Sequence, residues 1–248
     1  MIARVAADRF EIDWSRPWLA PLRERGEAIA RQAGQGGLLD ALNAASHSDV
    51  RVAAGRVRFV DPALQTAGEA YEAFVARTAC VPTRNNEHDF FNALVWLSLP
   101  AWKRRLNELQ AGQIALRGVA ATRGPVRDAL TLFDENGALL QAPQPLVDAL
   151  QARDWNTLFV TRRALWAEAR LRLFGHALLE KLNSPRKAIT AHVWVLPEAA
   201  DESLPHLITP ERWSARPFLP LPVLGVPGWW PGNEDAAFYA DTDVFRPG

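Results

Sequence analysis

The residues with the clearest capacity for chemistry are His88, Asp89 and Asn92, at the start of an apolar segment. On a helix, residues four apart share a face and neighbours lie about 100° apart, so these side chains form one polar stripe. Burying them is unfavourable unless each is hydrogen-bonded or bound to a ligand. An imidazole beside a carboxylate is common in metal ligation and acid–base catalysis. The stripe therefore predicts a catalytic or metal site, with all three residues as catalytic candidates.

The structural alternative for the same stripe is helix capping. Asn85 or Asn86 has the side chain of a helix N-cap, and the negative charge of Asp89 favours the positive end of a helix. In this interpretation His88 and Asn92 hold the neighbouring loops in place. The sequence leaves both interpretations open.

A second candidate pair is His176 and Glu180, whose spacing of four places both side chains on one helix face. The pair could bind one metal ion, or it could be an ordinary pair on a helix surface. Asp128 is expected near the start of a strand. Its carboxylate could complete a cluster with the histidines, so Asp128 joins His88, Asp89 and Asn92 as a candidate catalytic residue. Residues 134–135 are acidic but fall in an expected turn, where acidic side chains need no function.

Further candidates are residues that could contact a ligand without reacting with it. Arg84 and Arg127 carry guanidinium groups suited to an anionic group. Trp229 and Trp230 belong to a proline-rich motif that also contains Asn233. Exposed tryptophans would indicate ligand stacking or a protein contact. The alternative is that they hold an irregular tail against the core.

The single cysteine, Cys80, excludes a disulfide within the chain, which fits a reducing compartment. Cys80 could act as a nucleophile with His88, but a lone cysteine among apolar neighbours is more often a small buried residue. The first residues lack the apolar core of a secretion signal. The apolar run Phe90–Trp102 is interrupted by Pro100 and is too short to span a membrane. We therefore expect a soluble cytoplasmic protein with no membrane partner.

Composition and charge narrow the functional classes. The chain has 248 residues, of which 48% are hydrophobic and 23% charged, as in ordinary globular proteins. Its 28 basic and 28 acidic residues give a formal net charge of zero. A neutral protein has no overall field that attracts a polyanion, which argues against nucleic-acid binding.

The elements that must position these residues do not alternate regularly between strand and helix. Hydrophobic periodicity predicts helices at 16–32, 38–45, 66–77, 86–99, 101–110, 144–151, 155–169 and 176–182. Strands are expected at 56–60, 170–174 and 189–196, and a hairpin within 127–140 around Asn136-Gly137. No glycine-rich strand–turn–helix motif is present.

These elements indicate an α+β fold, a mostly helical single domain over residues 1–248 with a small antiparallel sheet. The body is expected at 14–196. Residues 197–248 form a long irregular segment rich in proline and tryptophan. Because a disordered tail would not be so aromatic, we expect this segment to pack on the body.

Several segments in a fixed order carry a family resemblance. They are Pro-Thr-Arg-Asn-Asn-Glu-His-Asp-Phe-Phe-Asn-Ala-Leu-Val-Trp at 82–96 and the segments 127–137, 174–182 and 222–235. The chain resembles the uncharacterised bacterial family known as domain of unknown function 3025, from roughly its first third to its C-terminus. The resemblance implies a single-domain bacterial protein and implies no activity.

Three functions remain as hypotheses, and the sequence does not decide whether the protein is an enzyme. The first is a metal-assisted hydrolase of a small phosphorylated or nucleotide-like substrate, with a divalent metal ion held by His88, Asp89, His176 and Glu180. The second is a non-catalytic module that binds a small-molecule ligand in an aromatic cleft. The third is a nucleic-acid binder that uses patches of arginine.

Overall fold

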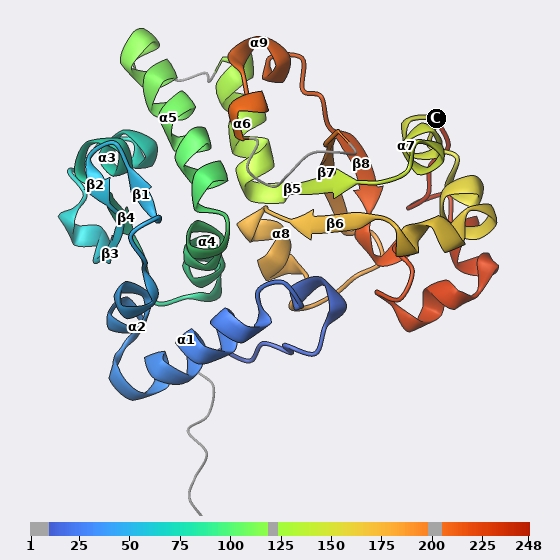
Figure 1. The fold of residues 1–248 in the computed structure, drawn as a ribbon, viewed down its shortest axis with the longest axis horizontal. Helices are drawn as coiled ribbons and strands as arrows, with labels where there is room; N and C mark the ends of the chain where they lie inside the picture. Colours follow the sequence, from blue (N-terminus) through green and yellow to red (C-terminus); the bar gives the residue numbers. More distant parts are fainter. Residues whose placement is uncertain (1–9, 119–123, 198–204) are drawn as a thin grey trace, which may run out of the picture. The chain divides into compact units, whose positions relative to one another are not determined.

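The computed structural model describes residues 10–118, 124–197 and 205–248 (Figure 1). These residues form two compact units. The helical unit comprises residues 10–15, 19–118, 124–131 and 205–215, and the sheet unit comprises residues 16–18, 132–197 and 216–248. The N-terminal residues predicted to lack a secretion signal, and part 198–204 of the predicted tail, lie outside the described residues.

The helical unit consists of helices and two short strand pairs. Its helices are α1 (Arg23–Gly36), α2 (Leu38–Ala45), α3 (Tyr71–Thr78), α4 (Glu87–Ser98), α5 (Pro100–Arg117) and α9 (Pro210–Trp213). Strands β1 (Arg51–Val52) and β2 (Gly55–Arg56) pair antiparallel, whereas β3 (Arg58–Val60) and β4 (Cys80–Pro82) pair parallel. Helix α1 packs on α2, and α5 packs on both α3 and α4.

Helix α4 lies at the core, as its apolar sequence predicts. Phe90, Phe91 and Ala93 are fully buried although they face different sides of the helix. Pro100 begins α5 directly after α4, because proline is tolerated in the first turn of a helix. None of the helices in the described parts of the chain combines the length and apolarity needed to cross a membrane.

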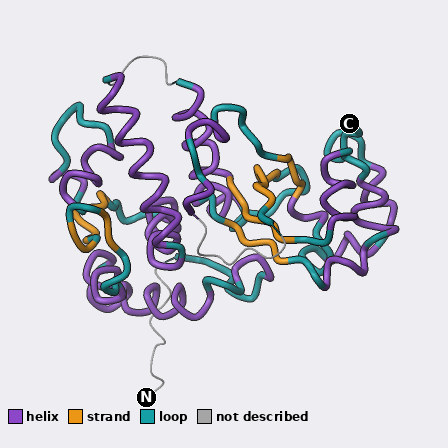
Figure 2. The backbone as a smooth tube through the Cα atoms, turned by 45° about the horizontal axis from the view of Figure 1, so that its top comes forward, coloured by secondary structure: helices purple, strands orange, loops and turns teal. Residues whose placement is uncertain are grey.

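The sheet unit is built on a four-stranded sheet with the strand order β6-β5-β7-β8, drawn in orange in Figure 2. The strands are β5 (Gly137–Gln141), β6 (Arg170–Leu173), β7 (Thr190–Val195) and β8 (Leu219–Pro222). Strand β5 runs antiparallel to β6 and parallel to β7, and β7 runs antiparallel to β8. Helices α7 (Gln144–Gln151) and α8 (His176–Lys181) belong to the same unit. The small sheet beside many helices confirms the α+β class.

The C-terminal segment contributes a strand that the sequence pattern does not indicate. Strand β8 contains Pro220 and Pro222, and it lies at the edge of the sheet, where a strand tolerates residues without an N–H group. Beyond it the chain continues in short 3₁₀ turns at 223–225, 231–234 and 236–240. The ring of Tyr239 stacks on Phe159 with centroids 5.0 Å apart, which attaches this segment to the unit.

The predicted hairpin within 127–140 is wrong. Helix α6 (Pro125–Asn136) continues to Asn136, and β5 begins at the next residue without a turn. Ala129, Leu130 and Phe133 are fully buried, and their spacing is that of one helix face rather than of a strand. Gly137 is the first residue of β5 and is not part of a turn. A glycine is needed there because a Cβ would lie 2.4 Å from the carbonyl oxygen of Phe133.

The stretch 155–169 is helical as predicted, but it does not form one regular helix. This stretch forms a π-helical turn at Thr157–Thr161 and a 3₁₀ turn at Arg163–Ala167. The indole of Trp166 donates a hydrogen bond of 2.9 Å to the carbonyl of Leu158, a group that a regular helix would pair with a backbone N–H. At 16–32 the helix itself begins only at Arg23, after a 3₁₀ turn.

Candidate functional site

The first turn of α4 contains the predicted N-cap. The side chain of Asn86 accepts a hydrogen bond of 2.8 Å from the backbone N–H of Asp89. The Asp89 carboxylate in turn accepts from Arg84, at 2.6 Å from its backbone N–H, 2.9 Å from Nε and 3.0 Å from Nη2. Asp89 is therefore held by the loop that precedes its helix, as the capping interpretation expects.

The third member of the stripe, Asn92, belongs to a buried polar network in the helical unit. Its side chain accepts a hydrogen bond of 2.8 Å from Lys103 Nζ and donates one of 3.1 Å to the hydroxyl of Tyr71. Lys103 is only 2% exposed, and its ammonium group lies 5.5 Å from the centre of the Trp96 ring. Asn92 on α4 is thus bonded to Tyr71 on α3 and to the buried Lys103 on α5. Of the three residues in the stripe, His88 is the one whose role these contacts do not account for.

In the sheet unit, one backbone carbonyl sets the position of His176. The carbonyl oxygen of Gly137 accepts hydrogen bonds from the N–H groups of Phe174, at 3.0 Å, and Gly175, at 2.8 Å. These bonds fix the start of α8 against the end of α6. The two backbones approach so closely that a Cβ on Gly175 would lie 2.5 Å from the carbonyl oxygen of Glu135.

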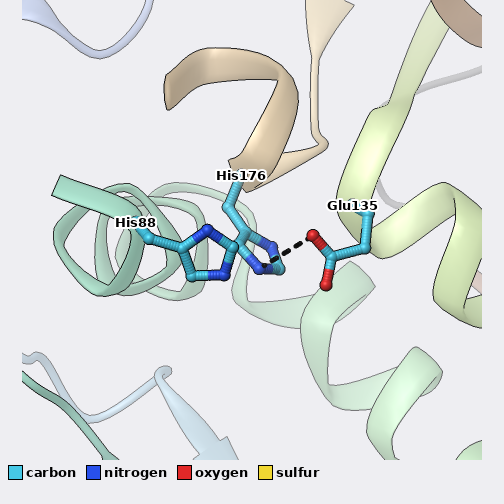
Figure 3. Close-up of side chains that lie close together, drawn as sticks. All are labelled: His88, Glu135 and His176. Atoms are coloured by element: carbon cyan, nitrogen blue, oxygen red, sulfur yellow. Dashed lines mark ion pairs between the residues drawn. The ribbon is translucent and has the colours of Figure 1, made fainter. Parts of the chain in front are cut away.

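Because of this close approach, the side chains of His176 and Glu135 meet. His176 Nε2 lies 3.6 Å from Glu135 Oε2 (Figure 3), and His176 is buried while Glu135 is partly exposed. The separation exceeds the usual range of an N–H···O hydrogen bond. Two ligand atoms about 2.1 Å from a tetrahedral metal ion are roughly 3.4 Å apart, which is close to this distance.

The carboxylates near His176 are only partly those predicted from the sequence. Glu180 lies four residues after His176 on α8, as expected, whereas Glu135, which forms an ion pair with His176, was not predicted. Asp128 lies in the first turn of α6, not near a strand start, and is about 10 Å from Glu135 along the helix axis. The assignment of 134–135 to a turn hid Glu135. The signal that could have revealed it is the helical spacing of Leu130, Phe133 and their neighbours.

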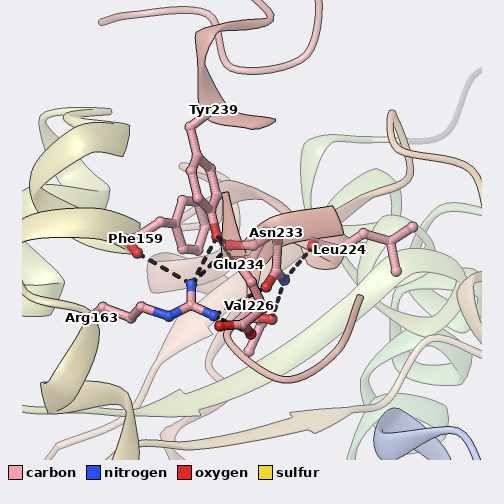
Figure 4. A network of polar contacts seen from close by, with 8 residues as sticks. Phe159, Arg163, Leu224, Val226, Asn233, Glu234 and Tyr239 are labelled. Atoms are coloured by element: carbon pink, nitrogen blue, oxygen red, sulfur yellow. Dashed lines mark hydrogen bonds and ion pairs between the residues drawn. The ribbon is translucent and has the colours of Figure 1, made fainter. Parts of the chain in front are cut away.

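The C-terminal candidates take part in a network that secures the tail. Asn233 is completely buried, and its amide donates hydrogen bonds of 2.8 Å to Leu224 O and 2.7 Å to Val226 O. Its Oδ1 accepts from Arg163 Nη2 at 3.1 Å, as Figure 4 shows. These contacts explain Asn233 without a ligand.

The two tryptophans beside this network are partly exposed. The ring of Trp229 lies 6.0 Å from that of Trp18 in a tilted arrangement. Trp230 lies close to Gly232. The aromatic cleft therefore stays a prediction.

The remaining predicted or considered residues lie in three different elements. Cys80 is a buried free thiol in β4, and His206 is exposed on a short 3₁₀ turn. Arg127 is buried in the first turn of α6.

Strand β7 contains a histidine, His192, whose pKa is altered. The pKa of His192 lies below its ordinary value of 6.5, first because burial disfavours the charged imidazole and second because the ammonium of Lys181 repels it. As the pH falls through 6.5, the unfolded chain binds this proton before the folded chain does, so folding stability decreases. We expect urea denaturation of a His192→Gln variant to show a weaker loss of stability between pH 7 and pH 5 than the wild type. Parallel curves for the two proteins would contradict this assignment.

Comparison with known proteins gives a family but no activity. A family model described as Protein of unknown function (DUF3025) matches residues 57–248, more than half of the chain. The match confirms the resemblance seen in the sequence and includes both α4 and the His176–Glu135 pair. No curated protein and no solved structure matches the chain.

Proposed function

Because the chain belongs to a family of proteins of unknown function, we propose its activity from its own side chains: a metal-assisted hydrolase of a small phosphorylated or nucleotide-like substrate. The observation that carries the proposal is the His176–Glu135 pair, with its nitrogen and oxygen 3.6 Å apart. An imidazole and a carboxylate at this separation suit a divalent transition metal ion. His88, which the sequence predicts as a ligand of the same metal ion, is kept as the third proposed ligand.

The ligand set in this proposal is His88, Glu135 and His176. Two imidazoles and one carboxylate are a known set for catalytic zinc, which keeps a further position for water. Such an ion lowers the pKa of bound water and so supplies hydroxide near neutral pH. Held by these three residues, the ion would supply this hydroxide for the hydrolysis of a phosphate ester. Asp89 and Asn92 then act as positioning residues, because their contacts hold the first two turns of α4 in place.

Metal analysis of tag-free protein tests the proposal. We expect close to one equivalent of a divalent transition metal in the wild type. His176→Ala and Glu135→Gln should each weaken metal affinity at least about tenfold, because each removes a ligand. Hydrolysis of para-nitrophenyl phosphate should fall with metal content and return when metal is added back to the wild type.

His206→Ala is the matched control, because it removes an exposed histidine outside the proposed site. It should keep the metal content of the wild type. A wild-type protein that is folded by circular dichroism yet binds no metal would overturn the proposal. Unchanged metal affinity in His88→Ala would exclude His88 as the third ligand.

The cellular setting follows the same reasoning. We place the activity in the bacterial cytoplasm, as the single cysteine and the family resemblance suggest. In the part of the chain that the structure describes, no comparable pair of side chains favours the aromatic-cleft or the nucleic-acid hypothesis.

A further inference from the structure

Arg127 is a buried cation for which the described structure offers no counter-charge. The residue is 7% exposed, and its Nε is buried without a hydrogen-bond partner. Among residues 10–118, 124–197 and 205–248, none forms an ion pair with its guanidinium group. A largely buried cation with an unpartnered Nε is unfavourable by itself, so this setting favours the binding of an anion.

The position of Arg127 in its helix strengthens this inference. It lies in the first turn of α6, where the helix dipole is positive and a cation is disfavoured. In that turn the N–H groups of Val126 and Arg127 have no acceptor within the helix, whereas Asp128 N donates to Gly124 O at 3.0 Å. Side chains on a helix lean toward its N-terminus, so the guanidinium and these N–H groups share one end of α6.

We propose that Arg127 and the first turn of α6 bind a phosphate group. A guanidinium offers paired donors that match phosphate oxygens, and the end of a helix adds N–H donors and a positive dipole. The Asp128 carboxylate lies about 100° round the helix from Arg127, so it projects in another direction.

The identity of the bound phosphate rests on the proposed function: it is taken to be an anionic group of the substrate that the proposed hydrolase cleaves. Arg127 and Glu135 lie eight residues apart on α6, or roughly 12 Å along its axis. The substrate class would then be a phosphorylated compound with its second anionic group well separated from the bond that is cleaved.

Thermal unfolding of metal-free protein in inorganic phosphate tests the site separately from the metal. At equal ionic strength, replacing chloride with 10 mM phosphate should raise the melting temperature of the wild type by roughly 3–5 °C if the dissociation constant is about 1 mM. Arg127→Met should lose this shift. Without phosphate it should be as stable as the wild type or more so, because it removes an uncompensated buried charge.

Two further variants make the result specific. Arg31→Met removes an exposed guanidinium from α1 and should keep the full phosphate shift. Arg127→Lys retains the charge without the planar fork, so its shift should be smaller than that of the wild type.

An equal shift in Arg127→Met and wild type, or no shift in either, would overturn the phosphate site. Equal stabilisation by acetate would overturn the assignment to phosphate. Because metal-free protein is used, none of these results depends on whether His176 and Glu135 bind a metal.

Discussion

Replacing Gly175 with alanine is expected to destabilise the protein by about 3 kcal/mol and to weaken metal binding at the same time. The added Cβ would lie 2.5 Å from Glu135 O, 2.5 Å from Asn136 N and 2.6 Å from Asn136 Cα. All three are backbone atoms, which cannot rotate away as a side-chain end can. Relief requires α8 to move from the end of α6, and that movement separates His176 from Glu135.

Urea denaturation followed by circular dichroism, together with metal titration, measures both effects. Gly112→Ala is the control, because Gly112 is an exposed residue inside α5 with nothing within 4 Å of an added Cβ. That change should stabilise the protein by about 1 kcal/mol through helix propensity. A Gly175→Ala variant with wild-type stability would show that the close contact between α6 and α8 does not position the pair.

Changing Asn233 to aspartate is expected to destabilise the protein by at least about 3 kcal/mol at neutral pH, although the two side chains have the same shape. The substitution places a carboxylate oxygen where the amide now donates to Leu224 O and Val226 O. Each carbonyl loses a donor, and a negative charge is buried against both. Below the carboxyl pKa the side chain can donate one hydrogen bond, so the difference from the wild type should shrink as the pH falls.

Denaturation at several pH values, with the wild type measured in parallel, tests this expectation. Glu234→Gln is the control: its ion pair with Arg163 at 2.6 Å involves an exposed carboxylate, and exposed pairs contribute about 0–1 kcal/mol. If Asn233→Asp matched Glu234→Gln at every pH, the tail would not depend on the buried amide.

Helices and strands could be predicted from the sequence where their residue pattern fits only one type of element. Helix α4 is apolar on nearly every side and follows an asparagine, and both its burial and its N-cap follow from local chemistry. Strand β7 is rich in β-branched and aromatic residues and forms where expected. Asn136-Gly137 led to the wrong prediction because that dipeptide favours hairpins. In the structure, position 137 needs a glycine because any Cβ there would collide with Phe133.

The candidate site was predictable only in part, because its geometry depends on contacts between distant segments. His176 could be selected as a histidine on a short helix, but its partner Glu135 precedes it by 41 residues. That pairing is set by Gly137 O, which no local pattern reveals. Asp89 and Asn92 looked equally suited to chemistry, and only their contacts with Arg84 and Lys103 distinguish a structural role.

Strand β8 also has a consequence for how the protein behaves at high concentration. An exposed sheet edge offers a row of N–H and C=O groups to which a strand from another molecule can add. The sheet ends at β8, where two of the four residues, Pro220 and Pro222, have no N–H to offer. This edge therefore resists extension by a neighbouring chain, so the prolines that made the segment look irregular protect this side of the sheet against edge-to-edge aggregation.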